Sequence, residues 1–316
     1  MTIRRILITG SSGMIGTRLC EKLLENNYDI VGVDLKPNKW NSKLNNFAII
    51  GDLRDNKTLK KLPKNIDLVI HLAANARVYN LISKPVLAKD NFDILFNVLE
   101  FCKYNNVKRF FFTSSREIYG NSRKVFHSEN DLLIQNCENA YGASKLGGEA
   151  LIYAYKKSYG INFIVVRFSN VYGMYDDSDR VIPLFIKLTK ENKNITIYGK
   201  EKLLDFIYID DAISGVLKCV DKFDVVENEV FNIASGKGIP IVELANLIKE
   251  YNKKSKSKII VKENRTGEVI KFIADISKAE KKLNFKPANT IIEGIIKTIK
   301  WYNAYYKSLR RIIFDD

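Results

Sequence analysis

The sequence has few of the residues on which metal and disulfide chemistry depend. Its 316 residues include only two histidines, His71 and His127, and four widely separated cysteines. The cysteines form no CxxC pair, which excludes a zinc ribbon and a thioredoxin-type redox centre. Scattered cysteines without a pairing pattern are typical of a reducing compartment. We therefore expect a cytoplasmic protein that holds no metal.

Long hydrophobic runs are also missing. No segment approaches the roughly 20 apolar residues that a transmembrane helix needs, and the N-terminus leads directly into a strand-and-turn pattern instead of a signal peptide. We expect no membrane association. Lys and Arg (51) exceed Asp and Glu (36), but the lysines are spread along the chain. This distribution favours solvated helix faces over a nucleic-acid interface, although a basic field also suits anionic small substrates. We expect no nucleic-acid partner.

What the sequence does contain is a regular alternation of short apolar runs and helical segments. Strands are predicted over residues 6–9, 30–34, 47–51, 68–72, 109–114 and 163–168. Helices are predicted over residues 14–26, 87–105, 141–159, 181–190, 211–220, 241–251 and 291–306. Apolar runs that do not alternate with polar residues are typical of strands buried on both faces. The sequence therefore predicts an α/β protein with a doubly wound parallel sheet, the Rossmann fold.

A glycine-rich turn follows the first predicted strand. Gly10, Gly13 and Gly16 lie in the segment TGSSGMIG, where a helix begins. A turn without side chains lets the backbone approach a pyrophosphate, and the helix N-terminus supplies free N–H groups and a favourable dipole. The turn therefore indicates a dinucleotide site, because strand and helix flank it as that site requires.

Two carboxylates are placed to recognise the adenosine half of such a cofactor. Asp34 ends the second predicted strand, 18 residues after Gly16, where it can accept hydrogen bonds from the ribose hydroxyls. A carboxylate would repel a 2′-phosphate, so Asp34 favours NAD over NADP. Asp52 could accept from the adenine amine or cap a helix. Further cofactor contacts are expected from Met14, Ile15, Leu53, Leu72, Ala73 and Ala74.

The regular alternation ends after Asn170, and an acidic stretch follows at residues 176–179. This change indicates a smaller, discontinuous substrate-binding lobe. We expect the NAD-binding domain to comprise residues 1–170 and 205–234. We expect the lobe to comprise mainly residues 171–204 and 235–316.

A candidate catalytic group lies on the predicted helix 141–159. Tyr141 and Lys145 are four residues apart and so share one helix face. A neighbouring ammonium, helped by an oxidised nicotinamide, favours the phenolate and makes the tyrosine a base. Ser115 follows the strand at 109–114, and ligands in open α/β sheets bind at the carboxyl ends of such strands. These three side chains are therefore predicted to meet at the cofactor.

Taken together, these motifs resemble the extended short-chain dehydrogenase/reductases, and more narrowly the NAD-dependent nucleotide-sugar epimerases and dehydratases of the UDP-glucose 4-epimerase type. The resemblance runs through TGxxGxxG at 9–16, Asp34, Gly51-Asp52, HLAA at 71–74, Ser115 with Tyr119-Gly120, Tyr141 with Lys145, and segments 167–173, 205–211, 231–234 and 265–268. It thus covers nearly the whole chain.

The resemblance implies a role for each matching residue. Ser115 would hydrogen-bond the reacting sugar hydroxyl, Tyr141 would act as the base, and Lys145 would support it and hold the nicotinamide ribose. The other implied contacts are Asn91 near the cofactor, and Asn170, Tyr198 and Arg265 at the substrate. In 4-epimerases hydride passes from C4 to NAD, the 4-keto sugar turns over, and hydride returns to its other face. Relatives also pair the helices at 87–105 and 141–159 in a homodimer.

Residue 117 keeps a second chemistry open. Dehydratases of this family carry Asp-Glu after the Ser or Thr, whereas this chain has Arg116 and Glu117. The difference argues against a standard 4,6-dehydratase, but Glu117 remains a candidate acid for elimination or for decarboxylation of a sugar acid. A non-catalytic NAD-binding protein is a further alternative, although such proteins usually lose the Tyr or Lys. We rank a UDP-hexose 4-epimerase first.

Two departures from the family pattern concern anion binding. Many relatives have an arginine where this chain has Leu204. Either Arg180 or a lysine such as Lys200 or Lys202 takes over at the diphosphate, or the diphosphate is bound more weakly. Arg77 is unusual and is expected to face the sugar. A carboxylated sugar such as UDP-glucuronate would be a natural partner for its guanidinium.

Overall fold

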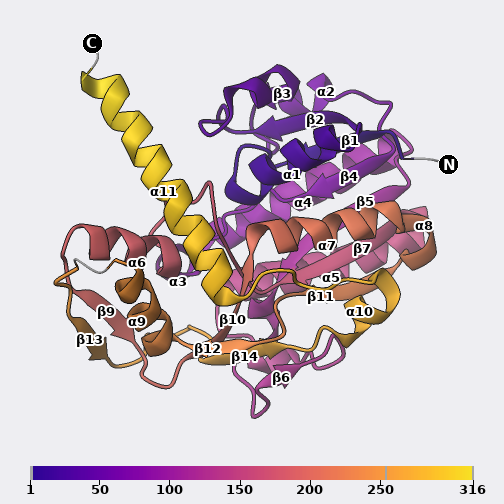
Figure 1. Ribbon diagram of the computed structural model, residues 1–316. Coiled ribbons are helices and arrows are strands. Elements are labelled where there is room, and N and C mark those ends of the chain that lie inside the picture. Colours follow the sequence, from indigo (N-terminus) through magenta and orange to yellow (C-terminus); the bar gives the residue numbers. More distant parts are fainter. Residues whose placement is uncertain (1–2, 253–254, 315–316) are drawn as a thin grey trace.

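A seven-stranded parallel sheet forms the centre of the larger lobe in this computed structural model, which describes residues 3–252 and 255–314 (Figure 1). The strand order is β11-β7-β5-β4-β1-β2-β3. The strands are β1 (Arg5–Thr9), β2 (Asp29–Asp34), β3 (Ala48–Ile50), β4 (Leu68–His71), β5 (Arg109–Ser115), β7 (Asn162–Phe168) and β11 (Glu229–Ile233). Every pairing within it is parallel. This arrangement confirms the predicted Rossmann fold.

Helices cover both faces of this sheet, which is why its strands are apolar throughout. Ile6 of β1 lies in a buried cluster with Leu19 of α1, whereas the next residue, Leu7, lies in a second cluster with Val98 of α4. Successive side chains of a strand point to opposite faces, so both faces form a core. One layer contains α1 (Met14–Glu25) and α7 (Ile209–Asp221), and the other contains α2 (Asn56–Lys61), α4 (Val86–Tyr104) and α5 (Ala140–Tyr159).

Two smaller sheets build the second lobe. A five-stranded sheet has the order β12-β10-β14-β6, with β8 beside β10, and a two-stranded sheet joins β13 to β9. Their strands are β6 (Phe126–His127), β8 (Asn170–Tyr172), β9 (Ile195–Tyr198), β10 (Leu203–Tyr208), β12 (Gly238–Pro240), β13 (Ile259–Lys262) and β14 (Lys271–Ala274). Helices α6 (Val181–Lys190) and α9 (Ile241–Tyr251) pack together beside β9. The chain thus leaves the large sheet after β7 and returns to it with β11. The precise division at residues 170, 205 and 234 stays a prediction.

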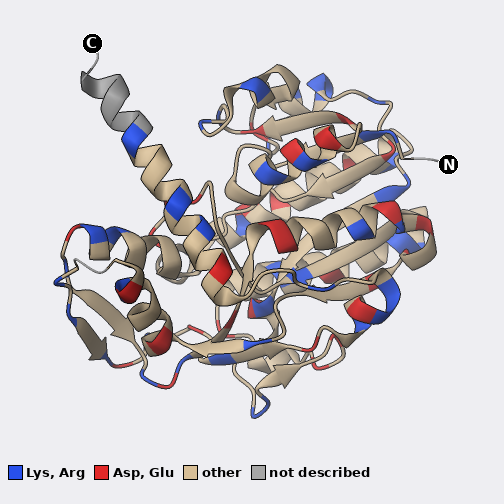
Figure 2. Ribbon diagram, viewed as in Figure 1, with Lys and Arg blue, Asp and Glu red and all other residues tan. Residues whose placement is uncertain are grey.

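Shorter elements complete the fold. They are α3 (Val78–Ser83), α8 (Phe223–Val226), α10 (Ser277–Leu283), the long C-terminal α11 (Ile291–Phe314), and 3-10 turns at Ser42–Phe47, Arg116–Tyr119 and Ile134–Asn136. Within the described residues no helix is long and apolar enough to cross a membrane. Basic side chains occur in both lobes with acidic ones between them (Figure 2). The excess positive charge is therefore spread over the fold.

Candidate functional site

A cavity of about 990 Å³ lies at the carboxyl ends of the strands of the large sheet and extends under the second lobe. Its wall includes the glycine turn after β1, Asp34 at the end of β2, Ser115 at the end of β5 and Arg265 from the second lobe. The volume is at the upper end of the range for small-molecule sites. The location is the one at which open α/β sheets bind nucleotides.

The glycine turn leaves no room for side chains. Gly10 has a φ of +73°, and a Cβ on it would lie 2.8 Å from the backbone nitrogen of Ala73. A Cβ on Gly16 would lie 2.1 Å from the carbonyl oxygen of Gly10. Gly13 begins α1 without any side-chain cap, so the first N–H groups of the helix remain available to a ligand. This cradle fits the pyrophosphate of a dinucleotide.

Asp34 and Asp52 both line the cavity, but their partners differ. Asp34 Oδ2 accepts a hydrogen bond from the backbone N–H of Ser12 at 2.9 Å, which holds the carboxylate against the glycine turn. Asp52 accepts hydrogen bonds from the side chain of Arg54, which lowers the pKa of Asp52. The helix that follows is capped by Asp55, whose side chain accepts from Lys57 N. Asp34 is thus positioned for the ribose, whereas Asp52 is shared with Arg54.

The remaining cofactor candidates divide into two groups. Met14, Ile15, Leu53, Leu72, Ala73 and Ala74 all line the cavity. Asn91 is buried beneath the wall instead: its Oδ1 accepts from Asn75 N at 2.7 Å, and its Nδ2 donates to Ser144 Oγ at 3.0 Å. Asn75 is the residue that lines the cavity there. Asn91 therefore supports the loop after β4 without lining the cavity itself.

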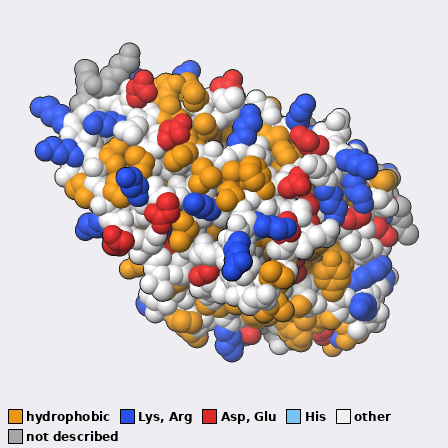
Figure 3. All heavy atoms as spheres, turned by 90° about the horizontal axis from the view of Figure 1, so that it is seen from below, with side chains coloured by type: hydrophobic (Ala, Val, Ile, Leu, Met, Phe, Trp, Pro, Cys, Tyr) orange, Lys and Arg blue, Asp and Glu red, His pale blue; other side chains and the backbone are white. Residues whose placement is uncertain are grey.

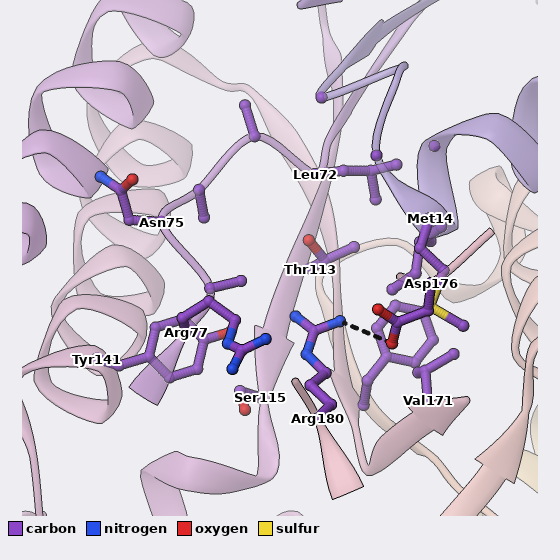
Figure 4. A pocket seen from close by; sticks show the side chains of 18 of the residues that line it. Met14, Leu72, Asn75, Arg77, Thr113, Ser115, Tyr141, Val171, Asp176 and Arg180 are labelled. Carbon is purple, nitrogen blue, oxygen red and sulfur yellow. Dashed lines mark ion pairs between the residues drawn. The ribbon is translucent and has the colours of Figure 1, made fainter. Parts of the chain in front are cut away.

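Ser115 and Tyr141 lie close together in the cavity (Figure 4), and Lys145 lines the cavity with them. Burial raises the pKa of the Tyr141 phenol, while Arg180 and a hydrogen bond with Ser115 act in the opposite direction. Burial also lowers the pKa of Lys145 to about 8, against the opposing effect of Glu149. Lys145 Nζ donates to the carbonyl oxygen of Thr113 at 2.8 Å and lies 5.9 Å from the centre of the Tyr141 ring. The arrangement provides a buried phenol with a serine and an ammonium beside it.

Two arginines face the same space as Ser115 and Tyr141 (Figure 4). Arg77 pairs with Asp179, and Arg180 Nη1 lies 3.7 Å from Asp176 Oδ2. Burial and the proximity of Arg180 lower the pKa of Arg77. Two partly desolvated guanidinium groups in one wall create a site for an anion or for several acceptor oxygens.

A third arginine lies in the second lobe. The Arg265 guanidinium is 3.6 Å from the centre of the Tyr198 ring, and Nη1 is 3.8 Å from Glu268 Oε1. Arg265 lines the cavity, whereas Tyr198 is not among the lining residues and supports the arginine by stacking. Asn170 lines it too, and its Nδ2 donates to Asp205 O at 2.7 Å.

The structure indicates which basic residue could bind the diphosphate in this chain, which has Leu204 where many relatives have an arginine. Leu204 is buried on β10, between β12 and β14. Lys202 pairs with Glu268, and neither Lys202 nor Lys200 lines the cavity. Of the three candidates only Arg180 belongs to the cavity wall.

Glu117 is buried with both carboxylate oxygens occupied. Arg116 Nη2 lies 2.8 Å from Oε1, and Asn139 Nδ2 donates to Oε2 at 3.0 Å. Both oxygens are thus engaged by protein side chains, which favours a structural role for Glu117 over an acid role. The sequence analysis did not predict that Arg116 and Asn139 would contact Glu117. The position of Asn139, two residues before the predicted helix, is nonetheless a recognisable N-cap signal.

Comparison with known proteins agrees with this geometry. Residues 6–234 match the NAD dependent epimerase/dehydratase family. The chain belongs to this family. A putative UDP-glucose 4-epimerase of Methanocaldococcus jannaschii is 34% identical, over 94% of this chain and 97% of the relative. A UDP-glucuronate 4-epimerase of Thermodesulfobacterium geofontis is 33% identical, over 97% and 98% of the two chains.

A solved structure extends the likeness to three dimensions. The UDP-glucose 4-epimerase of Thermotoga maritima, determined with UDP-glucose, superimposes with a TM-score of 0.87 at 30% identity, over 96% of this chain and 99% of that chain. As a family member the protein uses NAD, and the glycine turn and Asp34 fit that cofactor. The protein is therefore an NAD-dependent member of the epimerase/dehydratase family.

Proposed function

We propose that this protein interconverts UDP-hexoses at C4. The observation that carries the proposal is that Ser115, Tyr141 and Lys145 line one cavity, onto which the glycine turn also opens. The likeness to UDP-glucose and UDP-glucuronate 4-epimerases supports the same substrate class.

The residues of the site can carry out the proton transfers of this reaction. Ser115 Oγ hydrogen-bonds the sugar O4 hydroxyl, and Tyr141 Oη takes its proton as the general base. When bound, NAD would accept the hydride from C4, and its positive charge would offset the cost of burying a phenolate. Lys145 adds a second positive charge, 5.9 Å from the centre of the Tyr141 ring. Tyr141 returns its proton when the hydrogen comes back on the other face of the ring, so proton and hydride balance.

The decisive test is incubation with UDP-glucose, UDP-galactose, their N-acetylated forms and UDP-glucuronate, followed by NMR of the anomeric protons. No cofactor is added, because NAD is regenerated in each cycle. The expected result is conversion of one sugar to its 4-epimer, with the same final ratio from either side and no net NADH. A 4-keto-6-deoxy sugar or released CO₂ would contradict the proposal and indicate chemistry at Glu117.

A specific observation favours an acidic sugar as a second candidate substrate. Arg77 and Arg180 face the space beside Ser115 and Tyr141, and in the absence of substrate each interacts with an Asp of the 176–179 loop. The C6 carboxylate of UDP-glucuronate could take the place of Asp179 at Arg77. An Arg77→Ala variant should then lose about ten- to hundredfold in kcat/KM on UDP-glucuronate and change little on UDP-glucose. Equal losses on both sugars would argue against this role.

We also propose that the protein forms a homodimer through α4 and α5. Phe92 and Phe96 lie one turn apart on α4 and are 36% and 48% exposed, and the Phe92 ring packs over Gly147 of α5. Figure 3 shows that, on the face seen from below, hydrophobic side chains lie in groups among charged ones. Light scattering should give twice the mass of the chain, and Phe92→Glu with Phe96→Glu should give the monomer mass. A wild-type monomer would contradict this assembly.

A further inference from the structure

The side chain of Asn139 contacts three segments that build the site. It caps α5, because its Oδ1 accepts from Gly142 N at 2.8 Å. Its Nδ2 donates to Glu117 Oε2 at 3.0 Å and to the carbonyl oxygen of Gly267 at 2.9 Å. An N-cap needs only the acceptor oxygen, and Ser, Thr or Asp supplies it equally well. The two donor contacts are therefore additional to capping.

The first donor contact leads to the turn that follows Ser115. Glu117 N donates to Ser115 Oγ at 3.2 Å, and a Cβ on Gly142 would lie 2.9 Å from Glu117 O. The first turn of α5 thus rests directly on the backbone of the Ser115–Glu117 turn. Any shift of Glu117 would change the relative position of Ser115 and Tyr141.

The second donor contact leads to the loop of the second lobe that carries Arg265. Gly267 adopts a φ of +78°, and the next residue, Glu268, interacts with Arg265 and pairs with Lys202. The Gly267 carbonyl is held by Asn139, and the Glu268 carbonyl accepts from Asn121 Nδ2 at 3.0 Å. Two amide side chains of the large lobe therefore anchor this loop.

We propose that Asn139 is a positioning residue that couples the Arg265 loop to the Ser115–Tyr141 pair. Substrate that engages Arg265 holds the loop in place, and Asn139 transmits that position to Glu117 and to the first turn of α5. The coupling rests on the proposed function, because it assigns Arg265 to the nucleotide and Tyr141 to the sugar. It also gives Glu117 a structural role instead of an acid role.

The test is a double-mutant cycle on UDP binding, measured by calorimetry with the NAD-loaded protein. Asn139→Ser keeps the cap but removes both donors, and Arg265→Ala removes the clamp. Asn139→Ser should weaken UDP binding about tenfold, raise KM for the UDP-sugar and lower kcat. In the Arg265→Ala background the same change should have little further effect on UDP binding, because the two residues act together.

Two further variants of Asn139 distinguish an effect on the geometry of the site from a loss of fold stability. Asn139→Asp also keeps the cap, but it puts a carboxylate beside Glu117 and should weaken UDP binding more than Ser does. Asn139→Ala loses the cap as well and should therefore lower Tm further than Asn139→Ser does, without a matching further loss of UDP affinity.

The possible outcomes separate the coupling from the proposed reaction. Unchanged UDP affinity in Asn139→Ser, or effects of Asn139→Ser and Arg265→Ala that simply multiply, would overturn the coupling. Wild-type protein that binds UDP but converts no UDP-sugar would contradict the proposed function, while the binding cycle would still decide the coupling. Wild-type protein that binds no UDP would overturn both.

Discussion

The ammonium of Lys145 donates a hydrogen bond to the backbone carbonyl of Thr113, with 2.8 Å between Nζ and O. Thr113 lies on β5, two residues before Ser115, and Lys145 lies on α5, one turn after Tyr141. One buried contact thus fixes the helix that carries the phenol relative to the strand that carries the serine. The ammonium that lies beside the phenol thus also links the two elements that carry the proposed catalytic residues.

Burial of Lys145 makes stability depend on pH. Burial lowers the pKa of Lys145 to about 8, below the unfolded value of about 10.4. Between these values the unfolded chain binds more protons than the folded one, so the free energy of unfolding rises with pH. Lys145→Met removes the cost of burying the charge, but it also removes the hydrogen bond to Thr113. Relative to wild type, its free energy of unfolding should therefore be highest at pH 7 and should fall toward pH 10, with the lost hydrogen bond lowering it at every pH.

Urea unfolding at pH 7, 8.5 and 10 measures this difference. Lys157, exposed on the same helix, provides the control, because Lys157→Met should shift stability by a similar small amount at each pH. A difference in stability between Lys145→Met and wild type that stays constant from pH 7 to pH 10 would contradict the lowered pKa of Lys145.

Tyr141→Phe tests the proposed base. The phenol oxygen is the atom that takes the proton, so its removal should lower kcat by about a thousandfold. Tm should change little, because the ring remains. Initial rates of 4-epimer formation measure the first effect and thermal unfolding the second. Tyr153→Phe, on the exposed face of the same helix, should retain full activity, and an active Tyr141→Phe enzyme would rule out this base.

Glu117→Gln distinguishes a structural carboxylate from a catalytic acid. The substitution leaves the buried Arg116 without its counter-charge, which should cost about 3 kcal/mol of stability. The products should remain 4-epimers. Asp93→Asn, which removes an exposed ion pair with Lys89, should cost less than about 1 kcal/mol. If Glu117→Gln keeps wild-type stability but loses the ability to form a 4-keto-6-deoxy or decarboxylated sugar, the acid role is correct.

Two glycines of the nucleotide turn should respond differently to alanine. A Cβ on Gly16 would lie 2.1 Å from the carbonyl oxygen of Gly10, whereas a Cβ on Gly13 comes no closer than 3.4 Å to that oxygen. Gly16→Ala should therefore lower Tm even without cofactor. Gly13→Ala should fold normally but weaken NAD binding, because the methyl group meets the pyrophosphate. Thermal unfolding with and without NAD compares the two, and equal Tm values for both apo variants would contradict the steric argument.

Six of the seven strands of the large sheet could be predicted because their signals are local, whereas β11 was not predicted. The runs at β1, β2, β4, β5 and β7 are mainly apolar, and the glycine turn marks the first helix. Strands β6, β8 and β12 of the small sheets were missed because they have only two or three residues and pair with distant segments. Such pairings depend on tertiary contacts that periodicity does not report.

In the site, too, contacts between residues close in the sequence could be predicted, whereas contacts between residues far apart in the sequence could not. The Tyr141–Lys145 spacing on a helix predicted their proximity to Ser115. The resemblance implied that Asn91 and Tyr198 lie at the ligand, yet the cavity is lined by their partners Asn75 and Arg265. The contacts of Asn139 and Glu117 involve residues up to 128 positions apart. Side-chain partners at such separations follow from the assembled fold alone.

The place of β11 in the large sheet has a consequence for synthesis of the chain. Strand β7 is almost entirely buried, and its outer neighbour β11 begins 61 residues after β7 ends. While the ribosome makes residues 169–228, β7 is an unpaired apolar edge of the kind that recruits other strands. Strands β8, β9 and β10 of the second lobe are made during that interval, so the large sheet cannot be completed before most of the second lobe's strands have been synthesised. A chain stopped at residue 170 would retain this open edge and should aggregate.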